Sequence, residues 1–209
     1  TAGATIGHGL GVTPKVVLIK RRSQAGQWVM GHDSLGFTKF LELDLTGAAQ
    51  TSTVRFNDTA PTSSVFTVGS TADTNQNGTT IIAYCFAEIP GYSKFGSYTG
   101  NGSTNGTFVY TGFKPAFIIY KGAVGANAAD NWEMVDNKRS TYNGVENVLY
   151  PNLNNAEGTG VTTRMDLLSN GFKMRTSGTD YNGSGQTYIY MAFAENPLVG
   201  TNNIPATAR

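Results

Sequence analysis

The chain has 209 residues with 15 basic and 14 acidic side chains, and charged residues make up only 14% of it. This balance excludes a strong global field that would steer the protein to nucleic acid or to an anionic membrane. The 26 glycines and the many threonines, asparagines and serines favour strands and turns over helices, so we expect an all-β fold.

The first half of the chain contains several apolar or alternating segments, and each indicates a β-strand. After a Gly-rich opening, predicted strands lie at residues 14–20, from Trp28 onward, at 40–45, at 53–56 and at 65–68. The run at 78–90 (GTTIIAYCFAEIP) is almost wholly apolar at its centre, which predicts a central strand covered on both faces. Cys85, the single cysteine, lies in this run, so we expect it to be buried and unpaired.

The second half repeats the order of the first. Residues 185–197 (GQTYIYMAFAENP) match 78–90 at seven of thirteen positions, and the Gly-x-x-Pro start of residues 11–20 recurs at 112–121. Turn-forming Asn-Gly pairs mark residues 91–111, which we interpret as the link between the halves. Residues 139–163 have little periodicity and predict a long loop.

The repetition predicts an antiparallel β-sandwich of lectin or jelly-roll type that arose by internal duplication. Its first repeat covers residues 1–96, its second 97–200, and residues 201–209 form a C-terminal tail. Two copies are too few for a solenoid, whose units need about three stacked neighbours. Both a single pseudo-twofold sandwich and two tightly packed subdomains agree with this pattern.

Residues suited to catalysis are few. The sequence has two histidines, and no Cys/His spacing typical of metal sites, phosphate loop or dinucleotide fingerprint occurs in it. A glycan-degrading enzyme needs two carboxylates about 5–10 Å apart. Asp130, Glu133 and Asp136 are close in sequence, but an extended segment would place Glu133 opposite the other two. We therefore predict no enzymatic activity, no catalytic residue and no cofactor.

Two turns resemble the first half of a calcium-binding loop, with oxygen-bearing side chains at alternate positions. Neither is followed by the acidic residue that would complete such a loop, and Tyr84 and Met191 stand there instead. The residues also fit a simpler interpretation, in which Asp and Asn stabilise a hairpin turn while Gly takes a positive φ. The calcium candidates, which we rank below this turn interpretation, are Asp73, Asn75, Asn77, Asp180 and Asn182.

Aromatic side chains are the better candidates for binding, because their rings stack on the apolar faces of sugars while amides and hydroxyls bond the sugar hydroxyls. Trp28 and Trp132 recur at matched positions, which favours shared core packing over ligand contact. Tyr142, Tyr150 and Tyr181 stand among Asn and Gly in predicted loops, where recognition residues often lie. The candidate glycan-binding residues are Tyr142, Tyr150, Tyr181, Trp28 and Trp132.

Several long phrases carry a resemblance to a known family. They are TAPTSSVFTVG (59–69), the segment from Tyr84 to Lys121, LLSNGFKMR (167–175), YIYMAFAENP (188–197) and the terminal NIPATAR. The chain resembles a domain near the C-terminus of large virion-associated proteins of tailed phages, in particular of marine and cyanobacterial phages. The resemblance spans almost the whole chain and carries no catalytic motif with it.

The resemblance implies a phage structural protein of the virion, found in the extracellular particle. We expect the C-terminal domain of a tail fibre or receptor-binding protein, which attaches to host-surface polysaccharide and forms a homotrimer. The alternative is a capsid decoration or other assembly protein whose partner is another virion protein. Neither function involves nucleic acid or a membrane.

Overall fold

A computed structural model of the chain describes residues 2–125, 128–140, 143–159 and 163–195. Strands make up 41% of it and helices 6%, and all the strand pairs are antiparallel, which confirms the expected all-β fold. No helix in this described part is long and apolar enough to cross a membrane. The chain divides into two compact units, Thr1–Ala87 and Glu88–Arg209, which we describe separately.

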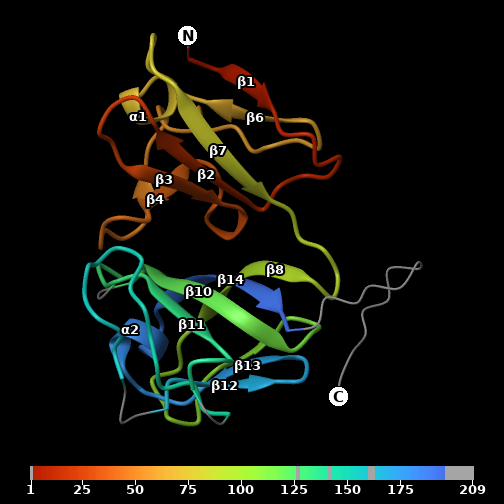
Figure 1. Ribbon diagram of the computed structural model, residues 1–209, viewed down its shortest axis with the longest axis vertical. Helices are drawn as coiled ribbons and strands as arrows, with labels where there is room; N and C mark the ends of the chain where they lie inside the picture. Colours follow the sequence, from red (N-terminus) through yellow and green to blue (C-terminus); the bar gives the residue numbers. More distant parts are fainter. Residues whose placement is uncertain (1, 126–127, 141–142, 160–162, 196–209) are drawn as a thin grey trace. The chain divides into compact units, whose positions relative to one another are not determined.

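Unit 1 contains two antiparallel sheets (Figure 1). Its elements are β1 (Ala4–Gly7), β2 (Val16–Arg21), β3 (Trp28–His32), the 3-10 helix η1 (Asp33–Leu35), β4 (Lys39–Glu42), β5 (Gln50–Thr51), β6 (Val65–Val68), α1 (Ala72–Asn75) and β7 (Ile81–Phe86). The larger sheet has the order β5-β4-β3-β2-β7, and the smaller sheet pairs β1 with β6. Val17, Val29 and Phe66 are among the buried residues that form the core of this unit.

Unit 2 also contains two antiparallel sheets (Figure 1). Its elements are β8 (Ser93–Thr99), β9 (Phe108–Tyr110), β10 (Pro115–Val124), β11 (Glu133–Asp136), β12 (Met165–Leu168), β13 (Gly171–Met174), α2 (Thr179–Asn182) and β14 (Thr187–Ala194). One sheet has the order β11-β10-β14-β8 and the other the order β12-β13-β9.

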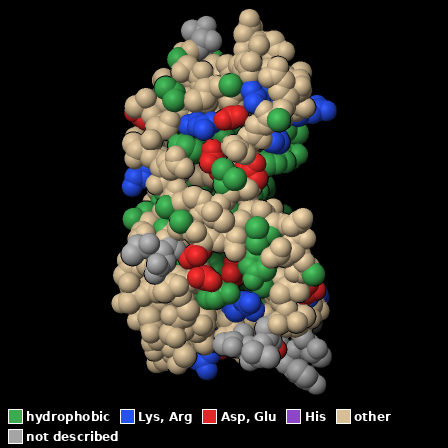
Figure 2. Space-filling view, turned by 90° about the vertical axis from the view of Figure 1, so that its left-hand side faces the viewer, with side chains coloured by type: hydrophobic (Ala, Val, Ile, Leu, Met, Phe, Trp, Pro, Cys, Tyr) green, Lys and Arg blue, Asp and Glu red, His purple; other side chains and the backbone are tan. Residues whose placement is uncertain are grey.

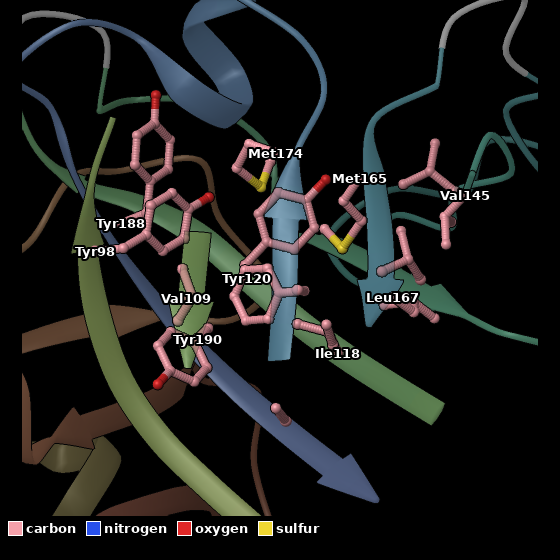
Figure 3. Packing of buried hydrophobic residues seen from close by; sticks show 14 of the residues in the cluster. Tyr98, Val109, Ile118, Tyr120, Val145, Met165, Leu167, Met174, Tyr188 and Tyr190 are labelled. Carbon is pink, nitrogen blue, oxygen red and sulfur yellow. The ribbon is translucent and has the colours of Figure 1, made fainter. Parts of the chain in front are cut away.

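The core of unit 2 is rich in tyrosine and methionine. Tyr98 and Tyr188 stack with their ring centroids 4.9 Å apart, and Met165 and Met174 are fully buried beside them (Figure 3). The hydroxyls of Tyr98, Tyr120 and Tyr188 each make a hydrogen bond, as buried polar groups require. The Tyr98 hydroxyl, for example, donates to the Tyr181 carbonyl at 2.7 Å.

Most predicted strands occur in the structure, with differences at three places. Residues 53–56 form a turn instead of a strand. Residues 91–111, which we interpreted as a link, contain β8 and β9. The units divide after Ala87, whereas the predicted boundary at residue 96 falls inside β8. The predicted tail, 201–209, lies outside the described residues.

The segments that match in sequence occupy matching positions in their sheets. The order β3-β2-β7 in unit 1 corresponds to β11-β10-β14 in unit 2. The sheets differ at both ends: β14 lies between β10 and β8 whereas β7 is the last strand of its sheet, and β3 pairs with β4 whereas β11 is the last strand of its sheet. The prediction of a central strand therefore holds for β14 and is wrong for β7. Origin of the two units by duplication stays a prediction.

Candidate functional site

The outer face of the sheet β12-β13-β9 carries two exposed aromatic rings. Strand alternation turns Val109 inward to the core and Phe108 and Tyr110 outward, where they are 46% and 62% exposed. Tyr110 is opposite Gly171, and Phe108 is opposite Lys173. We call this outward surface of β9, β13 and β12 the β9 face.

Glycine at position 171 keeps this surface open. A Cβ atom there would lie 2.1 Å from the Val109 carbonyl oxygen and 3.1 Å from the Phe108 ring. Any side chain at 171 would therefore displace the strand or the ring. As a result, Tyr110 projects from the edge strand β9 with no side chain opposite it on β13.

A polar hollow lies on the same face of the sheet, and Asp166 of β12 is part of its lining. Its volume is about 430 Å³, and it is lined by Thr104, Asn105, Asn143, Gly144, Thr163, Asp166 and Arg175. Asp166 lies in the same cross-strand row as Lys173 and Phe108, which places it about 10 Å from Phe108 at the usual strand spacing. Asn143 also lines two smaller hollows, of about 200 and 260 Å³, so the three hollows share one wall.

The charged side chains of the β9 face have polar partners, and two of them form an ion pair. Lys173 Nζ donates to Asn105 Oδ1 at 2.6 Å, and Arg175 Nε lies 3.3 Å from Asp166 Oδ2. Figure 2, which shows one side of the molecule, likewise has acidic and basic side chains in small mixed groups. A surface of this kind offers stacking, hydrogen-bond donors and acceptors to an uncharged polyhydroxyl ligand, and it offers no strong field to a highly charged one.

Two of the sequence-predicted tyrosines lie together elsewhere in unit 2, around Arg164. Arg164 Nε donates to the Tyr181 hydroxyl at 3.2 Å, and its guanidinium carbon lies 5.4 Å from the centre of the Tyr181 ring. Tyr150 hydrogen-bonds the same arginine. Both tyrosines are half-buried and pack against the core, so they are less available to a ligand than Tyr110. Tyr142 lies outside the described residues.

This arginine lies near a buried carboxylate. Glu133 is 2% exposed, and its Oε2 accepts a hydrogen bond from the Tyr120 hydroxyl at 2.5 Å. Burial raises the pKa of Glu133 to about 7, against the lowering effects of Tyr120 and Arg164. Asp180, which is distant in sequence, also acts on Glu133. Glu133 lines none of the three hollows described above, so it belongs to a packed polar network.

Asp136 lies on the opposite side of β11 from Glu133, as strand alternation predicts. Asp136 points away from the core and pairs with Arg139 at 2.5 Å. Asp130 precedes β11, where burial and the neighbouring Asp180 carboxylate raise its pKa. Asp180 of α2, a helix that contacts β10, acts on both Glu133 and Asp130.

The two tryptophans differ in exposure. Trp132 is 1% exposed, so its candidacy for sugar binding is wrong, and packing explains the conservation of its place in both halves. Trp28 is half-buried and stacks on Tyr84, with ring centroids 6.2 Å apart. Lys20 Nζ lies 5.7 Å from the Trp28 ring centre. The Trp28 ring is therefore partly accessible, and Tyr84 and Lys20 cover part of it.

Three of the calcium candidates bond to protein groups outside their own turns. Asp73 pairs with Arg55 at 2.5 Å and with Arg21 at 3.7 Å, and the Asn75 amide donates to the Gly69 carbonyl. The Asn182 amide donates to three oxygen atoms. Asp180 and Asn77 are exposed. Within the described ranges, no group of three or more His, Cys, Asp or Glu side chains could hold a metal ion.

The glycine expected in each turn has the expected conformation. Gly78 has φ of 74° and Gly185 has φ of 73°. Both follow a four-residue helix, α1 or α2, which the sequence analysis did not predict. The same analysis missed the β9 face, although the alternation of Phe108, Val109 and Tyr110 was a signal for it.

Comparison with known proteins gives a family and no function. A family model described as a domain of unknown function (DUF7483) matches residues 1–197. Neither a curated protein nor a solved structure matches the chain. Because the family model covers both units, the chain belongs to the DUF7483 family.

Proposed function

We propose that this chain is the receptor-binding domain of a phage tail fibre or related virion protein, and that its β9 face attaches the particle to host-surface polysaccharide. The resemblance of its sequence to domains of virion-associated proteins supports a place in a phage particle. The observation that carries the binding role is the exposed pair Phe108 and Tyr110 on the same face as a hollow lined by amides, hydroxyls and one ion pair.

Binding on this face is non-covalent. The ring of Tyr110 stacks on the C–H face of a sugar, and its hydroxyl remains free for a hydrogen bond. Asn105, Asn143 and Asp166 line the hollow at the side and bond the hydroxyls of a neighbouring sugar. Tyr110 and Asp166 stand on the strands β9 and β12, which hold them rigidly, so little conformational entropy of these two groups is lost when the ligand binds.

A single shallow face of this size binds a glycan weakly. Linking several such faces in one particle converts later binding events into intramolecular ones, which raises the overall avidity by about 10²–10⁴. A homotrimeric fibre would present three β9 faces to the same polysaccharide. The proposal therefore includes a trimer, whose mass light scattering on the purified chain would measure.

The test compares three alanine variants on an array of bacterial surface polysaccharides. Tyr110→Ala and Phe108→Ala each remove one ring of the β9 face. Tyr92→Ala removes a tyrosine of unit 2 that is 40% exposed and contacts Phe193, so it is a matched control. We expect saturable binding by the wild type and the control, and about a tenfold or greater loss in the first two variants. Equal binding by all four proteins would refute the proposed site, and no binding by a folded oligomer would refute the function.

A further inference from the structure

The edge of unit 1 at β7 has backbone groups without a partner strand. Arg22 N donates to Thr80 O, so the even-numbered residues of β7 direct their backbone groups toward β2. Ile81, Ala83 and Cys85 therefore direct theirs away from the sheet. In the part of the chain that the structure describes, β7 ends the order β5-β4-β3-β2-β7, and no strand pairs with this edge.

The corresponding edge of unit 2 is occupied. The matched strand β14 pairs with β8 in the register that sets Tyr190 opposite Gly96. Gly100 N donates to Gln186 O at 2.9 Å, and Ala194 N donates to Tyr92 O at 2.8 Å. The even-numbered residues of β14 therefore face β8, and the sequence match places Ile81, Ala83 and Cys85 at the equivalent positions of β7.

The side chains at the unpaired β7 edge are also less buried than those at the paired edge of β14. Tyr188, Tyr190 and Ala192 of β14 are buried, whereas Ile81, Ala83 and Cys85 of β7 are only half-buried although they pack against the core of unit 1. On the opposite face of β7, Tyr84 is 43% exposed. An unprotected edge with apolar side chains is a template for pairing with another strand.

We propose that the β7 edge binds an extended segment of a partner protein, which adds to the sheet as an antiparallel strand. The β8–β14 pair supplies the geometry for this strand. In unit 2 the Tyr190 ring lies against Gly96, so closely that a Cβ at 96 would meet its hydroxyl at 2.7 Å. Unit 1 has the small Ala83 in place of that tyrosine, so the added strand carries a bulky apolar residue opposite Ala83.

The partner segment has a defined pattern. Its core-facing residues, opposite Ile81, Ala83 and Cys85, are apolar, and none of them is proline because each donates its N–H to β7. Its alternate residues lie on the other face, where an aromatic side chain opposite Tyr84 covers that exposed ring. This pattern differs from the ligand of the β9 face, and the inference does not depend on the proposed glycan binding.

The test uses the full chain and a synthetic peptide. The peptide has the sequence of residues 92–100 with Lys94→Leu and Gly96→Val, so that leucine meets Cys85, valine meets Ala83 and Phe95 meets Tyr84. Amide hydrogen exchange measured by NMR reports on each position of β7. With the peptide at about ten times its dissociation constant, we expect exchange at Ala83 to slow about tenfold. Tyr84, whose backbone faces β2, is the internal reference and should change little.

Two controls distinguish backbone pairing from non-specific adsorption of the peptide through its side chains. The same peptide with an N-methyl group at residue 96 keeps the valine side chain and lacks its N–H donor, so it should not protect Ala83. The protein variant Ala83→Pro removes the outward N–H of β7 and leaves the pairing with β2, so it should fold and not bind. Tyr110→Ala, which alters only the β9 face, should bind the peptide as the wild type does.

Three results would overturn the proposal. The first is unchanged exchange at Ala83 when the unmethylated peptide is added at saturating concentration. The second is equal protection by the N-methylated peptide, which would indicate side-chain adsorption. The third is protection that rises with protein concentration in the absence of peptide, which would show that a second copy of the chain occupies the edge.

Discussion

Replacing Glu133 by Gln should remove a pH dependence from the stability of unit 2. The Glu133 carboxyl has a pKa of about 7 in the folded chain, because burial opposes its ionisation, against 4.5 for an ordinary glutamate. The folded state therefore binds this proton more tightly than the unfolded state does. The resulting stabilisation is complete below pH 4.5 and is lost as the pH rises through 7.

The size of this effect follows from the pKa difference. At about 1.4 kcal/mol per pKa unit, a shift from 4.5 to about 7 corresponds to about 3 kcal/mol. Glu133→Gln keeps an oxygen that accepts the Tyr120 hydroxyl and never ionises. The free energy of unfolding of the variant should therefore rise relative to that of the wild type by about 3 kcal/mol between pH 4 and pH 8.

The assay is urea denaturation across this pH range, followed by the fluorescence of Trp132. Trp28→Phe in all proteins removes the signal of unit 1, since each unit has one tryptophan. Other carboxyls titrate in the same range, so the difference between variant and wild type is the measured quantity. Glu146→Gln, an exposed carboxyl of the same unit, is the control. A difference for Glu133→Gln that stays constant with pH would refute the reasoning.

Two further substitutions test the packing of each unit. Asn182→Ala removes an amide that donates to Asn101 Oδ1, Ser103 O and Thr176 O. In urea titrations it should lower the free energy of unfolding of unit 2 by about 3 kcal/mol. A loss below about 1 kcal/mol would contradict this expectation. Gly69→Ala places a Cβ 2.1 Å from the Val54 carbonyl oxygen, so unit 1 should lose at least about 2 kcal/mol. Gly47→Ala, whose Cβ would make only an ordinary 3.4 Å contact with the Gln50 side chain, should not.

Local patterns predicted the strands well. The β-branched and aromatic segment 65–68 is β6 as expected, and the strand predicted from Trp28 onward is β3. Residues 53–56 have the composition of a strand but form a turn, in which the Val54 carbonyl accepts hydrogen bonds from Ser70 and Thr71. Tertiary contacts of this kind override local strand preference.

Features that depend on distant pairing could not be predicted. Whether a strand is central or at an edge depends on its neighbours, so the similar runs of β7 and β14 gave the same prediction for two different positions. Trp132 is fully buried and Trp28 is not, although their sequence contexts match. Phe108 and Tyr110 were overlooked because turn-forming Asn-Gly pairs dominate residues 91–111.

The polysaccharide array with Tyr110→Ala tests the proposed attachment to host glycan most directly. It should be run on proteins whose fold and mass have been checked, with Tyr92→Ala beside the wild type. We predict that one class of bacterial surface polysaccharide binds the wild type and Tyr92→Ala alike and loses about tenfold or more of its affinity for Tyr110→Ala. Undiminished binding by Tyr110→Ala, or no binding by any of the folded proteins, would contradict the proposal.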